Sequence, residues 1–474
     1  MTRVGVIGSG FGGLAVAVEL LRNGHEDVVL WERSDDLGGV WRDNTYPGSG
    51  CDVPSPLYQF SFAPRRTWSR RYAPQDEIFD YLHEVAASYG VSGRIVYGRT
   101  VVRATWQEED ARWEVGFADG TTEHVEVLVS AVGQLSEPRI PGVTGLEDFT
   151  GTAFHSARWD HSWAPRGQRV AVVGTGASAI QFVPHLVRDA ASVSVFQRTA
   201  NYILPKPDGP FPRWYHPAVA LERPLFRSAG EGFSRGLDDG SKVAKINKAV
   251  SLGHLRRQVR DPELRSKLTP DYPVGCRRIL FSNNYYPALT QPHVELVTES
   301  VTEVTPTGVR TPDGAEREVD AIVFGTGFAA QDFLAGIEVT GRDGAQLSKQ
   351  WSDGARAYLG VHVPGFPNLF VAYGPNTNLG GSSIIVMLEA QARHIRMVLD
   401  RMAELDHRSV EVTAAAEQVW DRDVQNRLER SAWAQCDSWY RHPVSGRITS
   451  NWPGGTRPYE ARTAELVPEA FAWE

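Results

Sequence analysis

The sequence predicts an α/β fold in which two similar units each form a strand, a glycine turn and a helix. VGVIGSGFGGLAVAVEL occupies residues 4–20, and VAVVGTGASAIQFVPHL occupies residues 170–186. Each stretch begins with a β-branched run typical of a buried strand and ends in an amphipathic segment with helical periodicity. The 474 residues are also too many for one compact core, because domains usually contain roughly 100–200 residues. We therefore expect two Rossmann-like domains.

The two glycine turns have the spacing of dinucleotide-binding turns. The first reads G-x-G-x-x-G and the second G-x-G-x-x-A, at Gly8, Gly10 and Gly13 and at Gly174, Gly176 and Ala179. The first glycine makes the turn, the second lets the backbone approach a pyrophosphate, and the third small residue lets the helix pack on the strand. A single such match is weak evidence. Two matches, each between a strand and a helix, are much stronger.

The residue at the end of the second strand of each unit selects the nucleotide. Glu32 follows Gly8 by 24 positions, and Arg198 follows Gly174 by the same 24. A carboxylate there accepts hydrogen bonds from the ribose hydroxyls and repels a 2′-phosphate, whereas a guanidinium binds that phosphate. We expect FAD or NAD in the first unit and NADP in the second. Because two dinucleotide sites in one chain suggest electron transfer, NADPH paired with FAD is the expected combination.

Later strands indicate that the second unit is inserted into the first. VEVLVSAVGQLSEPRIP at residues 125–141 and VDAIVFGTGF at residues 319–328 both look like strands that return the chain to the other domain. We expect an FAD domain at residues 1–146 and 331–474 and an NADP domain at 147–330, with a helical insert at about 205–275. Within the insert, Asp261 and Pro262 are typical of the first positions of a helix. The insert is a lid, a substrate wall or plain helical packing; the sequence leaves all three open.

Composition and cysteine usage favour a soluble multidomain protein of the cytoplasm. The net charge is −8 and no block of Lys and Arg stands out, which argues against a nucleic-acid partner. No apolar run approaches the roughly 18 residues of a membrane span, and the first strand begins too early to leave room for a signal peptide. The three cysteines, Cys51, Cys276 and Cys436, are far apart. Their sparse, odd number argues against a disulfide framework and fits a reducing compartment.

Two longer patterns identify a family. FTGTAFHSARWD fits F-x-G-x-x-x-H-x-x-x-W-[P/D], and GGVWRDNTYPGSGCD at residues 38–52 fits G-G-x-W-x-x-x-x-[FY]-P-G-x-x-x-D. The first pattern is matched at Phe149, Gly151, His155, Trp159 and Asp160. The chain thereby resembles the type I Baeyer–Villiger monooxygenases, class B flavoproteins related to the flavin-containing monooxygenases. Flavin-containing monooxygenases that oxidise nitrogen and sulfur typically end the first pattern in an aromatic residue and Lys, so the Trp-Asp ending favours the Baeyer–Villiger side.

The resemblance implies an oxidoreductase that uses FAD, NADPH and O2. Such an enzyme forms a C4a-peroxyflavin that inserts oxygen next to the carbonyl of a ketone, giving an ester or lactone. The substrate would be a small apolar organic molecule. One alternative keeps both cofactors but oxygenates nitrogen or sulfur, with the hydroperoxyflavin as electrophile. The sequence also leaves open a flavin reductase that releases only peroxide and a non-catalytic nucleotide-binding scaffold.

The resemblance also implies the roles of individual residues. Arg278 would sit over the flavin as a fixed cation, and Asp52 would pair with it. Arg277 would reach the 2′-phosphate, where relatives usually have Lys, and Thr199 would add a hydroxyl there. His155 would anchor a linker into the NADP domain and Trp159 would pack it, neither acting as a base. The softer assignments are Gly39, Trp41 and Tyr58 at FAD, Trp439 at the nicotinamide ribose, and Asn376 and Asn378 as donors near the flavin.

Overall fold

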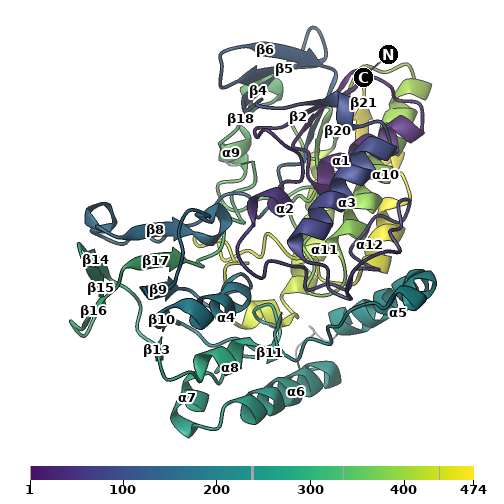
Figure 1. Cartoon of the computed structure of the whole chain (residues 1–474). Helices are drawn as coiled ribbons and strands as arrows, with labels where there is room; N and C mark the ends of the chain where they lie inside the picture. The colour runs from purple at the N-terminus through teal and green to yellow at the C-terminus, as the bar shows by residue number, and fades with distance from the viewer. Residues whose placement is uncertain (1, 236–239, 335, 437) are drawn as a thin grey trace.

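The computed structural model describes residues 2–235, 240–334, 336–436 and 438–474, and it has the predicted mixed α/β architecture (Figure 1). Two five-stranded sheets, each with parallel neighbours throughout, dominate it. The sheets lie in separate halves of the molecule, and both chain ends lie together on the half that contains the first sheet. No helix among the described residues is long and apolar enough to cross a membrane.

The first sheet has the strand order β19-β7-β1-β2-β3. Its central strand is fully buried, and the helices α1, α3 and α10 pack in the same core. A Cβ on Gly13 would lie 2.0 Å from the Gly8 carbonyl oxygen, so only glycine lets α1 pack this closely on the turn. The elements are β1 (Val4–Ile7), α1 (Phe11–Arg22), β2 (Val28–Trp31), α3 (Gln75–Ser88), β3 (Ile95–Val96), β7 (Val127–Ser130), β19 (Leu369–Val371) and α10 (Ile384–Glu404).

The second sheet repeats this plan with the order β13-β10-β9-β17-β8. Gly174 has a φ of +104° and Gly8 has a φ of +100°, so both turns use a conformation that favours glycine. The elements are β8 (Thr152–His155), β9 (Arg169–Val173), α4 (Ala179–Asp189), β10 (Ser192–Phe196), α8 (Tyr285–Leu289), β13 (Val294–Val297) and β17 (Ala321–Phe324).

The fingerprint segment at residues 149–160 is more than a linker. Its residues Thr152–His155 form β8, which pairs in parallel with β17 as the edge strand of the second sheet. Alternation of apolar and polar residues does not reveal this strand, because a four-residue edge strand is too short to show a period. Residues 152–155 therefore belong to the sheet, and the residues after them lead to the turn before β9.

Smaller sheets and helices complete the two halves. A four-stranded sheet, β18-β4-β5-β6, covers one end of the first half, and β14, β15 and β16 form an antiparallel meander beside the second sheet. The remaining elements are α2 (Val40–Asp43), β4 (Val101–Gln107), β5 (Arg112–Phe117), β6 (Thr122–Val125), β11 (Ile203–Leu204), β12 (Leu280–Phe281), β14 (Glu303–Thr305), β15 (Gly308–Arg310), β16 (Glu316–Glu318), β18 (Glu338–Thr340), α9 (Leu347–Gln350), β20 (Val410–Val412), α11 (Ala414–Leu428), α12 (Thr456–Thr463) and β21 (Phe471–Trp473).

The region at 205–275 is helical, and its helices pack on different halves. It contains α5 (His216–Arg235), α6 (Lys242–Gln258) and α7 (Pro262–Lys267). Asp261 caps α7 by accepting from the backbone N–H groups of Glu263 and Leu264, as predicted. Glu231 of α5 accepts from the backbone N–H and hydroxyl of Thr456, at 2.7 and 2.6 Å, so α5 is fixed to the first half. Helix α6 instead contacts β11 of the second half.

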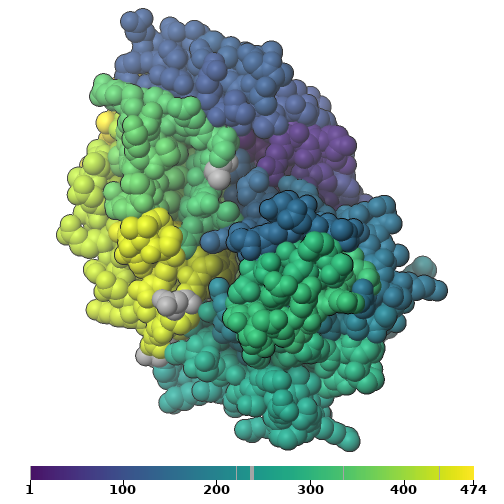
Figure 2. Space-filling view, turned by 90° about the vertical axis from the view of Figure 1, so that its left-hand side faces the viewer, coloured from purple at the N-terminus to yellow at the C-terminus, as the bar shows by residue number. Residues whose placement is uncertain are grey.

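The sparse, odd number of cysteines argues against a disulfide framework, but one pair of them is bonded. Cys276 and Cys436 form a disulfide, with their Cα atoms 6.1 Å apart. Cys51 is free and buried. The loop before Arg277 and the segment after α11 meet in space although 160 residues separate the two cysteines. Sequence spacing carries no signal of such a contact. Figure 2 shows the C-terminal residues, in yellow, lying beside the residues of the second half, in green and teal.

Candidate active site

The first glycine turn forms a cradle of backbone. Helix α1 has Gly10 as its N-cap, and no side chain caps its first N–H groups. The Cα of Gly39 lies 3.7 Å from the position that a Cβ on Gly10 would occupy. Such uncapped N–H groups at a helix N-terminus suit a pyrophosphate. The second turn is similar, because Ser178 at the N-cap of α4 makes no side-chain cap either.

Glu32 lies directly after β2, and the protein already supplies donors to both of its carboxylate oxygens. Oε2 accepts from the N–H and hydroxyl of Ser9, and Oε1 accepts from Arg42 and the N–H of Ser34. Burial raises the pKa of Glu32. The Ser9 hydroxyl, the charge of Arg42 and the two N–H groups lower it by more than burial raises it, so the pKa lies below its ordinary value. Glu32 is therefore an anion, and a ribose hydroxyl would displace one of these donors.

Trp41 and Tyr58 form an aromatic wall near the same turn. The indole N–H of Trp41 donates to the Tyr58 hydroxyl over 3.0 Å, and the two rings meet edge to face. Tyr58 also packs edge to face on Phe11, the first residue of α1. The expected flavin residues thus lie next to the helix whose N-terminus would hold the pyrophosphate.

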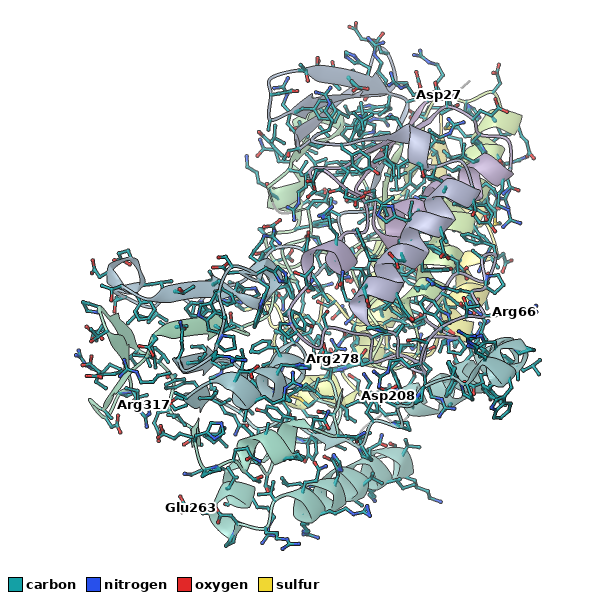
Figure 3. The ribbon with its side chains drawn as sticks, viewed as in Figure 1. Asp27, Arg66, Asp208, Glu263, Arg278 and Arg317 are labelled. Atoms are coloured by element: carbon teal, nitrogen blue, oxygen red, sulfur yellow. A yellow bond between two sulfur atoms is a disulfide. The ribbon has the colours of Figure 1, made fainter. Side chains whose placement is uncertain are left out.

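Arg278 and Asp52 form an ion pair between the two halves. Nη2 of Arg278 lies 2.6 Å from Oδ2 of Asp52. Figure 3 shows Arg278 where the halves meet. The Asp52 charge raises the pKa of Arg278, whereas burial acts in the opposite direction, so the guanidinium stays charged. Its side chain is nevertheless 42% exposed, which leaves part of the cation accessible to a ligand.

Two tyrosines lie beside this pair, Tyr440, which is buried, and Tyr373, which is partly buried. Burial raises the pKa of Tyr440 to about 12, and it also raises the pKa of Tyr373. Arg278 contributes a smaller, opposite effect to both. The tyrosines are neutral near pH 7, so Asp52 is the anion that holds Arg278.

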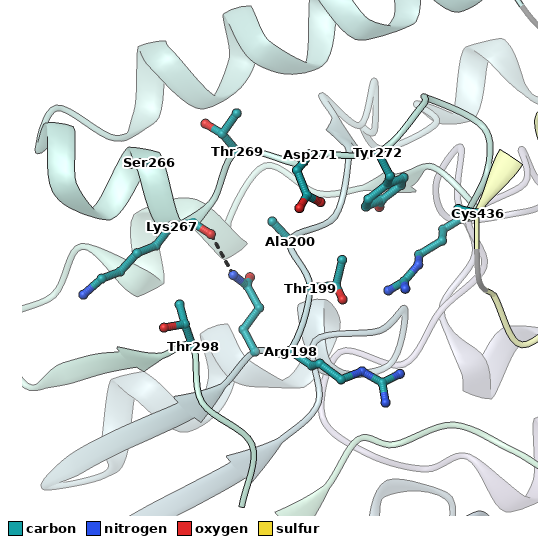
Figure 4. Close-up of a pocket in the computed structure, with 12 residues that line it drawn as sticks. Arg198, Thr199, Ala200, Ser266, Lys267, Thr269, Asp271, Tyr272, Thr298 and Cys436 are labelled. Carbon is teal, nitrogen blue, oxygen red and sulfur yellow. Dashed lines mark hydrogen bonds between the residues drawn. The ribbon is translucent and has the colours of Figure 1, made fainter. Parts of the chain in front are cut away.

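The residues expected at the 2′-phosphate line one cavity of about 490 Å³ (Figure 4). Arg198, Thr199 and Arg277 all contribute to it, and Arg198 follows the end of β10 as expected. The guanidinium of Arg277 lies 5.2 Å from the centre of the Tyr272 ring. In the described part of the chain Arg198 makes no hydrogen bond or ion pair within the protein, so it is available to a ligand. Lys267, Asp271 and Cys436 also line the cavity.

Trp439 lies on the C-terminal segment that the disulfide ties to this cavity. Its side chain is 41% exposed, and its ring centre is 4.1 Å from that of Tyr440. Trp439 is thus next in sequence to a residue that faces Arg278. Its assignment to the nicotinamide ribose stays a prediction.

The fingerprint residues His155 and Trp159 pack at the edge of the second sheet. His155 is 3% exposed, and its Nδ1 accepts from the N–H of Ala157. Burial lowers the pKa of His155, so the ring is neutral near pH 7. Trp159 packs against Phe154 and against Phe182 of α4, with ring centres 5.1 and 5.5 Å apart. These two residues therefore serve the geometry of the turn before β9.

The other three fingerprint residues fix the ends of this segment. A Cβ on Gly151 would lie 2.4 Å from the Asp320 carbonyl oxygen, so the close approach of these two backbone segments requires glycine. Phe149 packs in the small cluster beside the second sheet. Asp160 accepts from the N–H and hydroxyl of Ser162, at 2.9 and 2.5 Å, and so closes the following turn.

The expectation for Asn376 needs correction, because its amide group is used inside the protein. Its Nδ2 donates to the carbonyls of Ile448 and Asn451, and the residue is buried. Asn378 is bonded to Tyr373 and to Asn451. Both asparagines therefore support the loop before α10. An Asn in a loop looks the same in sequence whether its amide faces a ligand or a neighbouring carbonyl.

Sequence reasoning also missed three side chains that support the site. Arg42 bonds Glu32, Gln181 of α4 donates to the Gly50 carbonyl over 2.9 Å, and Lys206 donates to the Cys51 carbonyl over 3.1 Å. Arg42 lies within the pattern at residues 38–52, at a position where the pattern accepts any residue. Gln181 and Lys206 belong to the other half of the molecule, so nothing local in the sequence links them to residues 50–52.

Two nucleotide-type turns in two halves, joined by a partly exposed cation, define a two-cofactor oxidoreductase. The sequence model of the flavin-binding monooxygenase-like family matches residues 1–214. A Baeyer-Villiger monooxygenase of Pseudomonas aeruginosa is 41% identical over 99% of this chain and 91% of its own length. One of Streptomyces coelicolor is 42% identical over 98% and 91%.

Solved structures agree. The chain matches the structure of OTEMO in complex with FAD and NADP with a TM-score of 0.91 and 28% identity, over 100% of this chain and 99% of that one. The chain belongs to the flavin-binding monooxygenase-like family and, within it, to the Baeyer–Villiger monooxygenases. It is an FAD-containing, NADPH-dependent monooxygenase, and the predicted fold and cofactors are confirmed.

Proposed function

We propose that this monooxygenase oxidises a small apolar ketone to an ester or lactone, with Arg278 and Asp52 as its catalytic pair. The observation that carries the proposal is the 2.6 Å contact between these two residues at the junction of the two halves. FAD, when bound, supplies the chemistry that activates O2. The residues of the chain then supply charge, orientation and exclusion of water.

Arg278 would stabilise negative charge that develops on oxygen during the reaction. A cation that is already fixed in place does this without reorganisation during the reaction. Asp52 would hold the guanidinium in one orientation through its carboxylate. Because the Asp52 charge raises the pKa of Arg278, the cation would persist over the whole working pH range.

Arg198, Thr199 and Arg277 would select NADPH by binding its 2′-phosphate. They line one cavity together, and arginine suits phosphate through charge-assisted hydrogen bonds. Glu32, Gly8, Gly10, Gly13, Gly39, Trp41 and Tyr58 would hold FAD, and Gly174, Gly176, Ala179 and Trp439 would contact NADP.

We also propose the division into an FAD domain at 1–146 and 331–474 and an NADP domain at 147–330. Two separate parallel sheets support it, since β19 returns to the sheet of β1. The insert at 205–275 would join the two, because α5 bonds to the first half. We place the enzyme in the cytoplasm, where NADPH is available as reductant.

The test is a screen of NADPH consumption across ketones, sulfides and amines, with mass analysis of the products. We expect esters or lactones from at least one ketone, with one oxygen atom of ¹⁸O2 in the product. Oxygenation of amines or sulfides with no ester from any ketone would instead support nitrogen or sulfur oxygenation. Consumption that yields only hydrogen peroxide for every compound would contradict both.

A further inference from the structure

A lysine outside every recognised motif lies beside the Asp52–Arg278 pair. Lys206 follows β11, and its ammonium donates a 3.1 Å hydrogen bond to the Cys51 carbonyl oxygen. The ammonium also lies 4.8 Å from the centre of the Tyr72 ring. The Cys51 carbonyl belongs to the peptide group that joins Cys51 to Asp52, so Lys206 holds the main chain of Asp52 while Arg278 holds its side chain.

Lys206 and Arg278 are carried by the same two-stranded ribbon. Strands β11 and β12 pair in parallel, with Ile203 opposite Leu280. Arg278 lies two residues before β12, and Lys206 lies two residues after β11. The Lys206 N–H donates to Asn283 Oδ1 over 3.0 Å, and its carbonyl accepts from Asn283 Nδ2 over 2.7 Å. The backbone under the ammonium is therefore fixed relative to Arg278.

The charge of Lys206 is partly desolvated, so its contacts matter. Burial lowers the pKa of Lys206, while the negative charges of Asp208 and Asp52 partly oppose this shift. Burying an ammonium group destabilises the folded protein unless its N–H groups find hydrogen-bond acceptors. The acceptor of its hydrogen bond is the Cys51 carbonyl, which lies on the opposite side of the junction between the two halves.

A second contact shows that this stretch of the first half is held from the same side. Gln181 of α4 donates to the Gly50 carbonyl and accepts from the Tyr46 hydroxyl, both over 2.9 Å. A Cβ on Gly48 would lie 2.5 Å from Nε2 of His185. Residues 46–52 thus lie tightly against the second half, and Lys206 bonds this stretch at the residue next to Asp52.

We propose that Lys206 is a positioning residue for the catalytic pair: it fixes the main chain at Asp52, so that the carboxylate holds Arg278 in its working orientation. This inference rests on the proposed role of that pair. Lys206 bonds the main chain beside Asp52 and not the carboxylate or the guanidinium, so it acts through Asp52 and is not itself catalytic.

The test compares Lys206→Met, Lys206→Arg and Lys206→Gln with the parent, and uses Lys245→Met as a matched control. Lys245 lies on the exposed face of α6. The first measurement is hydrogen peroxide release during NADPH oxidation with no organic substrate, so its outcome does not depend on which compound the enzyme oxygenates. We expect Lys206→Met to raise the release rate by about 5- to 30-fold, the factor that corresponds to 1–2 kcal/mol. Lys206→Arg should stay near the parent rate.

A second measurement requires no turnover. Hydrogen exchange of peptides that cover residues 46–52 should be faster in Lys206→Met than in the parent and unchanged in Lys245→Met. A double-mutant cycle with Asp52→Ala then asks whether Lys206 acts through Asp52. If it does, Lys206→Met adds little peroxide release to the Asp52→Ala background. If Lys206→Met does not fold, Lys206→Gln should release more peroxide than Lys206→Arg, for the same reason.

Two results would overturn the inference: additive effects in the cycle, or peroxide release in the Lys206 variants equal to that of Lys245→Met. Arg278→Ala separates this failure from a failure of the proposed function. If Arg278→Ala releases peroxide rapidly while Lys206→Met behaves like the parent, only the positioning role is wrong. If Arg278→Ala also behaves like the parent, the catalytic pair itself is misassigned.

Discussion

Replacing Arg198 with alanine tests how the second nucleotide site recognises NADPH. Arg198 is exposed, lines the cavity with Thr199 and Arg277, and makes no ion pair within the described part of the chain. Because the Arg198 side chain bonds to no other group among the described residues, we expect Arg198→Ala to fold normally and to have the melting temperature of the parent. Any effect on cofactor use would then come from lost contact with the nucleotide.

The size of the effect follows from the type of contact that is lost. A hydrogen bond to a charged group contributes about 1.5–3 kcal/mol, which corresponds to roughly a 10- to 150-fold change in affinity. Arg277 remains in the cavity, and Lys267 is partly neutralised by Glu263 at 3.0 Å. We expect the KM for NADPH to rise by this factor with kcat nearly unchanged, because the contact is the same in the ground and transition states. The KM for NADH should barely change.

The assay is steady-state oxidation of NADPH and of NADH at saturating O2. Arg166→Ala is the matched control, since Arg166 is an exposed arginine of the same half that does not line the cavity. Equal losses for NADPH and NADH would refute the reasoning, because they would show that Arg198 supports the structure of the site and does not read the phosphate.

Four further outcomes are expected. Denaturing the purified yellow protein should release FAD, and release of FMN or of no flavin would contradict the assignment of the first turn. Arg278→Ala should keep FAD but divert NADPH oxidation from ester to hydrogen peroxide, with Asp52→Ala a milder case; unchanged ester yield would rule out the catalytic role. Burial lowers the pKa of His394 to about 4, and it also lowers the pKa of His362, whose ring nitrogen lies 3.0 Å away. As the pH falls below about 6.5, the unfolded chain gains protons that these two buried rings do not, so stability should fall there, and His394→Gln should make the melting temperature less dependent on pH. Peptide mapping without reductant should find Cys276 joined to Cys436, and three free thiols would contradict that bond.

What could be predicted from the sequence is local or repeated in the chain. The offset of 24 residues from Gly8 to Glu32 and from Gly174 to Arg198 follows from strand, turn and helix lengths. Such lengths are fixed by backbone geometry, so the sequence alone places both residues at the ends of their strands. The pairing of Asp52 with Arg278 is expected only through the family resemblance, because the two residues lie 226 positions apart.

The contacts that escaped prediction connect segments from different halves. The Cys276–Cys436 bond and the Lys206 contact with Cys51 each depend on how loops meet after both sheets have formed. Hydrophobic periodicity describes how an element faces its own core and says nothing about where a loop lies on another domain. The edge strand β8 escaped for a different reason, since its four residues pair only on one side.

The location of these contacts bears on how the site is assembled. Arg278 with Asp52, Lys206 with Cys51, and Gln181 with Gly50 all join the second half to one short stretch of the first. Each is a hydrogen bond of 2.6–3.1 Å, and a displacement of the halves by more than about an ångström along this junction would break all three together. The orientation of Arg278 is therefore a property of the contact between the halves. A substitution that loosens that contact should impair catalysis even when every catalytic and cofactor-binding residue is intact.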